Sequence, residues 1–307
     1  MQRACKENLP LHEGRDLRSR TSLFAGSVWL TAWLSMTGAC ATPEAVDFDG
    51  AAKELPPGTE FTVSGGRADL ENRYRTVVLI SSERGLCSGV LVAPKLALTA
   101  AHCLCLPVAT EPSPGFVDSA SCAKDVTVAA HLYKAGTLPD SPIESNARLY
   151  QGVASAYPGF KAELRKEGVA SFEGDLAVVL LAQPVQGVRI DSQLPKAEVA
   201  IDESLTMVGY GDTQHRGADS GHRRFGRNVV TNIQLAAGGN GAFAFRALGA
   251  HTHEGDSGGP CFRESRSGRW LVGINMGSAN SGTISLFTST FHYRAWIADQ
   301  ISAALRD

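Results

Sequence analysis

The sequence lacks concentrated charge of either sign. Its 29 lysines and arginines are nearly balanced by 31 aspartates and glutamates, which gives a formal net charge of −2 over 307 residues. A nucleic-acid interface needs a clustered basic patch, so no nucleic-acid partner is expected. Internal repeats and long low-complexity stretches are missing too. The remaining composition, 43% hydrophobic and 20% charged, is typical of a globular chain with one large domain or two small ones.

The apolar run near the start, "LFAGSVWLTAWLSM" (23–36), is too short for an ordinary transmembrane helix, which needs about 20 apolar residues. Three basic residues, Arg15, Arg18 and Arg20, precede it, and the small-residue stretch "TGACA" follows it. This order of basic segment, apolar core and small-residue exit predicts a secretory signal within residues 1–41. A signal anchor is the alternative.

The stretch "TGAC" also resembles the lipobox of bacterial lipoproteins, in which Cys40 would carry the lipid. It departs from that pattern at Thr37, where an aliphatic residue is usual, and ordinary cleavage near Ala39 or Ala41 is the alternative. Residues 42–62 are rich in proline and alanine and are predicted to be a tether or pro-segment. The chain is therefore expected to be exported, either secreted or lipid-anchored at the cell envelope, with membrane contact only through an N-terminal anchor.

Export also governs how the seven cysteines are interpreted. Cys5 would leave with the signal, and Cys40 lies at its exit. The cysteines that remain are Cys87, Cys103, Cys105, Cys122 and Cys261. In an exported protein, paired cysteines form disulfides before they bind metals, and an odd number leaves at least one thiol over. Zinc binding by "HCLC" with Cys122 is the weaker alternative, and we expect no metal and no cofactor.

From residue 63 onward, short β-rich runs alternate with clusters of glycine and proline. Strands are predicted at residues 75–81, 88–94, 95–101, 176–182, 204–211, 227–236, 241–247, 269–276 and 283–290. Their spacing favours an antiparallel all-β fold. Residues 104–160 contain several prolines and are expected to form long irregular loops.

One amphipathic helix is predicted at the end of the chain, over residues 291–305. Trp296, Ile297, Ile301 and Leu305 fall on one face at helical spacing.

Three stretches bring together the residue types of nucleophilic catalysis. "LTAAHC" places His102 directly after an apolar strand, and "GDLAVVLL" places Asp175 at the mouth of a buried strand. "HEGDSGGP" places Asp256 and Ser257 among three glycines and a proline, a composition that suits neither a helix interior nor a central strand. A serine hydroxyl needs an adjacent base to act as a nucleophile at neutral pH. We therefore expect a bent backbone that turns the Ser257 hydroxyl and nearby N–H groups toward one substrate carbonyl.

The segments "CSGVLVAPKLALTAAHC", "GDLAVVLL" and "GDSGGP" resemble the three signature segments of the chymotrypsin/trypsin-like serine endopeptidases. The resemblance implies an all-β fold of two packed six-stranded antiparallel β-barrels with a C-terminal α-helix. The protease domain would span residues 63–307, with the junction of the barrels near 185–200. Protein or peptide substrates would bind between the barrels.

The resemblance also assigns roles to residues. His102 would be the general base, Asp175 would orient it, and Ser257 would be the nucleophile. The backbone N–H groups of Gly255 and Ser257 would form the oxyanion hole.

The family pattern further implies a disulfide between Cys87 and Cys103, beside the catalytic histidine. A second bridge between Cys105 and Cys122 is expected in the loop insertion. Cys261 is then expected to be a small buried apolar residue.

The family is usually made as a zymogen. "VSGG" resembles its processed N-terminus, which predicts a cut between Thr62 and Val63 by an activating protease that is not trypsin-like. The new α-amino group of Val63 would pair with Asp256, since a buried carboxylate needs a cationic partner. A simple glycine turn before the first strand is the alternative.

His251 stands six residues before Ser257, at the base of the family's specificity pocket, with Thr252 beside it. An imidazole offers no carboxylate to a basic side chain, so cleavage after Arg or Lys is not expected. A loop insertion or deletion that shifts this count is the alternative.

Two other function classes compete with a trypsin-like protease. "GDSGG" also matches the nucleophile elbow of α/β-hydrolases, but that fold needs its acid and histidine after the serine, and only His292 follows. The second is a catalytically inert trypsin-fold module that binds or regulates. Labelling of Ser257 by a fluorophosphonate separates an enzyme from such a module.

Overall fold

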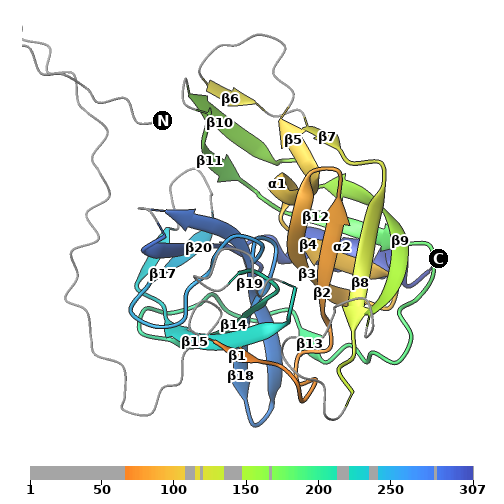
Figure 1. Cartoon of the computed structure of the whole chain (residues 1–307). Helices are drawn as coiled ribbons and strands as arrows, with labels where there is room; N and C mark the ends of the chain where they lie inside the picture. Colours follow the sequence, from red (N-terminus) through yellow and green to blue (C-terminus); the bar gives the residue numbers. More distant parts are fainter. Residues whose placement is uncertain are drawn as a thin grey trace, which may run out of the picture. The chain divides into compact units, whose positions relative to one another are not determined.

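The computed structural model describes residues 66–107, 115–117, 120–134, 147–165, 168–212, 221–234, 241–279 and 282–306 (Figure 1). All of them belong to one compact unit, residues 48–307. The predicted signal, the tether, Cys40, Thr62 and Val63 lie outside the described residues. Within the described ranges, no helix is long and apolar enough to cross a membrane.

The first half of the unit forms a closed six-stranded antiparallel barrel. Its strands are β2 (Val77–Ser82), β3 (Gly85–Ala93), β4 (Leu96–Thr99), β8 (Val126–His131), β9 (Ala147–Ala156) and β12 (Ala177–Leu181). They pair in the order β12-β4-β3-β2-β8-β9, and β12 also pairs with β9, which closes the ring. The first predicted barrel is thereby confirmed.

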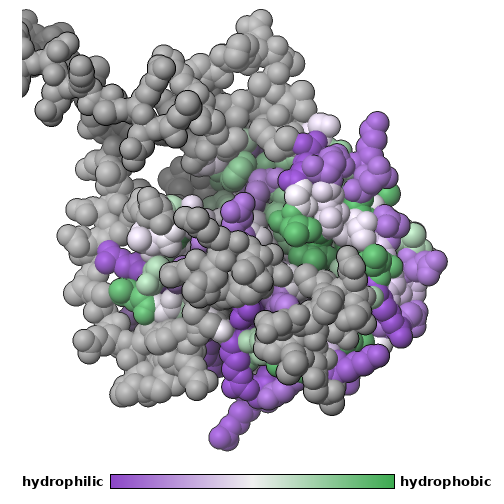
Figure 2. All heavy atoms as spheres, viewed as in Figure 1, coloured by the Kyte–Doolittle hydropathy of each residue, from purple (hydrophilic) through white to green (hydrophobic). Residues whose placement is uncertain are grey.

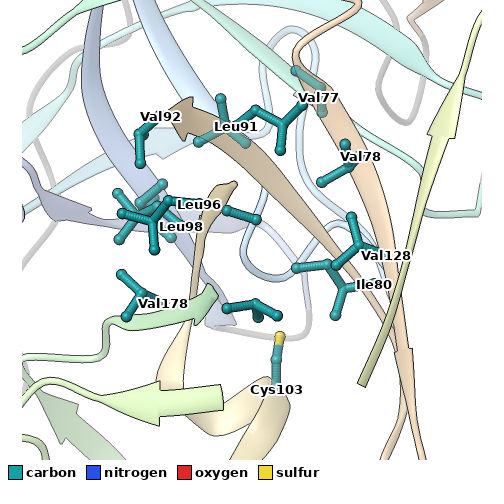
Figure 3. Close-up of a cluster of buried hydrophobic side chains, with 14 of the residues drawn as sticks. Val77, Val78, Ile80, Leu91, Val92, Leu96, Leu98, Cys103, Val128 and Val178 are labelled. Atoms are coloured by element: carbon teal, nitrogen blue, oxygen red, sulfur yellow. The ribbon is translucent and has the colours of Figure 1, made fainter. Parts of the chain in front are cut away.

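Aliphatic side chains from these strands fill the barrel. Figure 3 shows the valines, leucines and isoleucines of β2, β3, β4, β8 and β12 gathered around one core, with Cys103 at its edge. Val77, Val90, Leu98 and Val179 are completely buried. Each such side chain contributes about 1.5–3 kcal/mol through removal of apolar surface from water.

Some apolar side chains remain on the outside of this barrel. Val153 on β9 and Leu180 on β12 lie opposite each other in paired strands and are 68% and 40% exposed. Figure 2 shows hydrophobic surface among hydrophilic residues on the half of the view that holds the first-barrel strands of Figure 1. Small patches of this kind are ordinary on protein surfaces.

The expectation of long loops over residues 104–160 was wrong. The barrel strands β8 and β9 both lie in this range, and Val126 and Val128 of β8 are completely buried. Segments that contain proline and cysteine surround β8 and β9, and this composition favours a loop prediction. The same range also holds the short strands β5 (Cys105–Pro107), β6 (Gly115–Val117) and β7 (Ala120–Cys122). The helical turn α1 (Ala101–Leu104) lies at its start, and β10 (Lys161–Arg165) and β11 (Gly168–Glu173) follow it.

The second half forms a sheet of nine strands. They are β1 (Arg67–Ala68), β13 (Ser192–Gln193), β14 (Ser204–Gly209), β15 (Arg224–Val229), β16 (Asn232–Gln234), β17 (Ala242–Arg246), β18 (Pro260–Ser265), β19 (Gly268–Ala279) and β20 (Ile284–Ser289). Six of them follow the order β15-β14-β18-β19-β20-β17, with β1 and β16 added at the ends and β13 beside β19. The Asn228 side chain on β15 donates to the carbonyl of Arg246 on β17 at 2.8 Å. A side-chain hydrogen bond thus joins the two ends of the six-strand series, as in a second barrel.

Each of the nine predicted strands overlaps an observed strand, with ends shifted by a few residues. The run 227–236 divides into β15 and β16 because the backbone of Val230 turns to bond with Asp202 and Glu203 instead of continuing the ladder. Besides the five strands β5 to β9, which lie in the range expected to be loops, the strands β1, β10, β11, β13 and β18 were not predicted.

The C-terminal helix α2 (Arg294–Ala304) is confirmed, but Leu305 is not part of its packed face. Ile297 is completely buried, whereas Leu305 follows the last helical residue and is 65% exposed. The chain leaves the packed surface at this point, which helical spacing alone does not reveal.

A buried ion pair links the segment near β1 to both halves. Arg223 Nε donates to Asp69 Oδ2 at 2.7 Å, and both side chains are inaccessible to solvent. The same guanidinium donates to the carbonyl of His131 at the end of β8 at 2.9 Å. The carboxylate also accepts the N–H groups of Arg73 and Tyr74. Every member of this buried polar cluster therefore depends on the others.

Replacing Asp69 by Asn should strongly destabilise the protein, because it leaves the Arg223 cation buried without its partner. We expect the free energy of unfolding in urea to fall by about 3–5 kcal/mol. The matched control is Glu71→Gln in the exposed Arg67–Glu71 pair, whose side chains are 52% and 59% exposed. That change should cost less than about 1 kcal/mol. Equal losses in the two variants would contradict this account.

Candidate active site

His102 lies in α1, a single turn that directly follows β4. The adjacent Cys103 is bonded to Cys87 of β3, with a Cα–Cα distance of 6.1 Å. This disulfide fastens the turn to the barrel and closes a 16-residue separation, which is worth about 3 kcal/mol in the chain-entropy view. Cys103 is only 6% exposed, so the backbone on the C-terminal side of His102 is held in place by packing and by the disulfide.

Asp175 lies two residues before the start of β12 and is completely buried. Its Oδ2 is 2.7 Å from His102 Nδ1, and its Oδ1 accepts the His102 backbone N–H at 2.8 Å. Both carboxylate oxygens are thus engaged by one residue, which fixes the imidazole against the carboxylate.

The environment of His102 favours its charged form. Burial of the imidazole opposes protonation, but the Asp175 carboxylate outweighs this effect through its charge and hydrogen bond, and the pKa of His102 is raised above 6.5. The ring of Phe172, on β11, stacks on the imidazole with centroids 5.2 Å apart and planes inclined by 15°. Phe172 therefore limits the rotation of the ring on one face.

Ser257 follows a tight turn over residues 253–256. The Asp256 N–H donates to the His253 carbonyl at 3.1 Å, and Gly255 has a φ of +91°. A hydrogen-bonded turn with positive φ at its third position is of type II, which calls for glycine there. The turn conformation therefore explains why glycine stands at position 255, two residues before Ser257.

Gly258, with a φ of +79°, has a second reason to be glycine. A Cβ at this position would lie 2.0 Å from Thr99 Oγ1 and 2.3 Å from the Ser88 carbonyl oxygen. The loop therefore packs directly on the backbone of β3 and β4.

The polar groups around Ser257 are partly uncommitted. Among the described residues, neither the Gly255 N–H nor the Ser257 N–H donates a hydrogen bond. The Ser257 carbonyl accepts the Ser88 N–H at 2.8 Å. No hydrogen bond within the described ranges joins Ser257 Oγ to His102, whose Nε2 lies 3.9 Å from Cys103 Sγ.

Asp256 is 2% exposed and accepts two backbone N–H groups. Gly211 donates to its Oδ1 at 2.8 Å and His253 to its Oδ2 at 2.9 Å. Burial outweighs these bonds and raises the pKa of Asp256 to about 7. None of the ion pairs among the described residues includes it. The carboxylate is thus placed where a cation would be stabilising.

His251 and Thr252 lie on the stretch before this turn. His251 is partly exposed, with Nδ1 3.2 Å from the Gly249 carbonyl oxygen. Thr252 is 3% exposed, and its N–H donates to Ser285 Oγ on β20 at 2.9 Å. The Thr252 hydroxyl is buried and has no partner in the described part of the chain.

The other cysteines follow the expected pattern. Cys105 and Cys122 form the second disulfide, and Cys261 is a free thiol that is completely buried in the second hydrophobic core. Burial raises the pKa of the Cys261 thiol far above its ordinary value. The sulfurs that the zinc alternative would need at His102 are bonded in pairs, so they offer no thiolate ligands.

Sequence reasoning missed three residues of the site. Phe172 stacks on His102, Ser88 bonds to the loop of Ser257, and Asn275 on β19 exchanges backbone hydrogen bonds with Gly258 and Gly259. Asn275 is 1% exposed, and its Nδ2 has no partner among the described residues. Ser88 lies within the segment "CSGVLVAPKLALTAAHC", but nothing in the local sequence shows what its hydroxyl contacts.

Comparison with known proteins agrees with this geometry. Residues 63–297 match the protein family described as Trypsin, well over half of the 307 residues, and the chain belongs to that family. It is 25% identical over 262 residues to a trypsin-like protease of Streptomyces glaucescens, covering 78% of this chain and 83% of the relative. It is 24% identical over 254 residues to a trypsin of Saccharopolyspora erythraea, covering 78% and 98%. Membership of this family supports a serine protease function.

Solved structures show the same fold. The chain resembles a mutant of human heparin binding protein (CAP37) with a TM-score of 0.56 and 18% identity, covering 78% of this chain and 96% of that one. Human heparin binding protein itself matches with a TM-score of 0.53 and 18% identity over 76% of this chain and 95% of that one. At this identity the likeness establishes the chymotrypsin-type fold alone.

The charge of Asp175 should control the titration of His102. Asp175→Asn removes the effect that raises the pKa of His102 and leaves burial, so the imidazole should titrate below 6.5 instead of above it. Histidine ring signals followed by NMR against pH measure this shift, and His102→Gln assigns the signal. An unchanged His102 titration in Asp175→Asn would show that the carboxylate is not its cause.

Proposed function

We propose that this chain is an exported serine endopeptidase that hydrolyses peptide bonds through an acyl-enzyme. His102 is the general base, Asp175 orients it, and Ser257 is the nucleophile. The observation that carries the proposal is the 2.7 Å contact between His102 Nδ1 and the buried Asp175 carboxylate. A carboxylate at Nδ1 keeps the ring proton there and leaves Nε2 free to accept one.

In acylation, Ser257 Oγ attacks the carbonyl carbon of the scissile bond while His102 Nε2 takes the hydroxyl proton. The negative charge that develops on the substrate oxygen is stabilised by the N–H groups of Gly255 and Ser257, which donate no hydrogen bond to any described residue. The imidazolium then gives its proton to the leaving amine as the C–N bond breaks.

Deacylation repeats the sequence with water. His102 takes a proton from the water molecule, whose oxygen attacks the acyl carbon. The imidazolium returns that proton to Ser257 Oγ as the ester bond breaks, which releases the acid product and restores the enzyme. No metal or cofactor is needed at any step.

Export is the second part of the proposal. The two disulfides support it, because such bonds form and persist in oxidising compartments. A signal within residues 1–41 would direct the chain out of the cytoplasm, and lipidation at Cys40 would retain it at the cell envelope.

Activation by cleavage between Thr62 and Val63 is the third part. Asp256 supports it, since this carboxylate is buried, has a pKa raised to about 7 and forms no ion pair among the described residues. The α-amino group of Val63 would supply that cation and fix the turn before Ser257. If Cys40 carries a lipid, the same cut would free the enzyme from the membrane.

The catalytic proposal is tested by labelling with a fluorophosphonate. The processed chain should react at Ser257, and Ser257→Ala should not. Ser257→Ala or His102→Ala should lower kcat for a peptide substrate by about 10⁶-fold, since members of a triad act as a unit. If the wild-type chain is processed and folded and still does not react, the protein is an inert trypsin-fold module instead.

Specificity is the last part of the proposal. His251 and the Thr252 hydroxyl, which has no partner among the described residues, offer polar groups but no carboxylate, so a basic side chain would be desolvated there without a countercharge. We propose that the enzyme does not prefer Arg or Lys before the scissile bond. An acidic or a medium apolar side chain suits His251 better, depending on its charge.

A positional peptide library run on processed enzyme should therefore show weak cleavage after Arg and Lys. The N-terminus of the active material is sequenced first, and a start well upstream of Val63 contradicts the activation step. Efficient cleavage after Arg or Lys that is lost in Ser257→Ala would show that an acidic pocket residue comes from elsewhere.

A further inference from the structure

Ser88 uses every polar group it has, and two of its bonds reach the loop of Ser257. It lies on β3 next to Cys87 and is completely buried. Its N–H donates to the Ser257 carbonyl at 2.8 Å, and its hydroxyl donates to the Gly255 carbonyl at 2.9 Å. Its Oγ accepts the Tyr210 N–H at 2.9 Å, and its carbonyl accepts the Thr99 hydroxyl at 2.8 Å.

We propose that Ser88 is a positioning residue for the oxyanion hole. Its hydroxyl holds the Gly255 carbonyl, and its N–H holds the Ser257 carbonyl, so the two residues whose N–H groups face the substrate are fixed from one point. The inference rests on the proposed function, because only a chain that forms an oxyanion needs these N–H groups in register.

The geometry of the turn shows why such a restraint matters. The peptide between Gly255 and Asp256 is held at both ends, its oxygen by Ser88 Oγ and its N–H by the His253 carbonyl at 3.1 Å. Gly255 itself has little intrinsic preference, since glycine adopts positive and negative φ about equally. The orientation of its N–H is therefore set by hydrogen bonds on both sides of Gly255. The peptide before it is held through the Glu254 carbonyl by the Asp212 N–H at 3.0 Å, and the peptide after it is held from the barrel by Ser88.

The Ser88 hydroxyl makes two hydrogen bonds that an alanine side chain cannot make. It is donor to Gly255 and acceptor from Tyr210 at once, which uses its single proton and one lone pair. Ser88→Ala would leave both of those buried backbone groups without a partner. The loop would then satisfy them by shifting, and preorganised donors lose their effect when they move.

The test compares Ser88→Ala with wild type, with kcat expressed per fluorophosphonate-labelled serine so that unfolded chains do not count. We expect kcat to fall about 10- to 100-fold, somewhat less than the loss of a whole oxyanion donor, with KM changed less than about threefold. The inhibition constant of a peptide boronic acid, whose adduct places an oxygen in the oxyanion hole, should rise by a similar factor.

Two comparisons separate positioning from general stability. Thr290→Val removes another completely buried hydroxyl, one that donates to the Leu271 carbonyl, and should leave kcat unchanged at a similar loss of melting temperature. Ser88→Thr and Ser88→Val share one shape, and only the variant with a hydroxyl should retain kcat near wild type. Equal kcat in that pair, or an equal fall in Thr290→Val, overturns the proposal. Absence of labelling in processed wild type would instead refute the proposed function.

Discussion

The loop that carries Ser257 packs directly on the backbone of the first barrel, with no room for a side chain between them. A Cβ on Gly258 would fall 2.0 Å from Thr99 Oγ1 and 2.3 Å from the Ser88 carbonyl oxygen. Thr99 ends β4, and His102 follows three residues later on the same chain segment. One close contact therefore fixes the serine loop, from the second half of the fold, relative to the segment that carries the histidine. The glycines and the small Ser88 side chain are required by this contact.

Three aspartates are buried in the described part of the chain, and each is stabilised differently. Asp69 meets the Arg223 guanidinium, and Asp175 meets both His102 Nδ1 and the His102 backbone. Among the described residues, Asp256 accepts the N–H groups of Gly211 and His253 and forms no ion pair, and burial raises the pKa of its carboxyl to about 7. Two N–H dipoles do not balance the loss of hydration of a full charge. A cation would therefore be most stabilising beside Asp256, where a change in the charge of the carboxylate acts directly on the turn before Ser257.

The sequence allowed prediction of the elements whose signals are local. Apolar runs such as those of β2 and β14 identified strands. The resemblance to the family predicted the disulfide between Cys87 and Cys103, next to His102. The strands β8 and β9 escaped because their short apolar stretches lie among loop-forming segments, and strand pairing is decided by tertiary contacts. Ser88 illustrates the deeper limit. Its partners Tyr210 and Gly255 lie 122 and 167 positions away, so its role became visible only when the two halves were assembled.

The same hydrogen bonds also connect the N-terminal side of the fold to the serine loop. Arg223 Nη1 donates to the Tyr210 hydroxyl at 3.2 Å, and the Tyr210 N–H donates to Ser88 Oγ. The next residue, Gly211, donates to Asp256. Asp69 pairs with Arg223, so a continuous series of buried hydrogen bonds leads from Asp69 to both sides of the turn. Each of these hydrogen bonds joins buried polar groups that have lost their hydration. Loss of any one of them leaves a buried group without a partner, and the serine loop can satisfy that group only by changing its conformation.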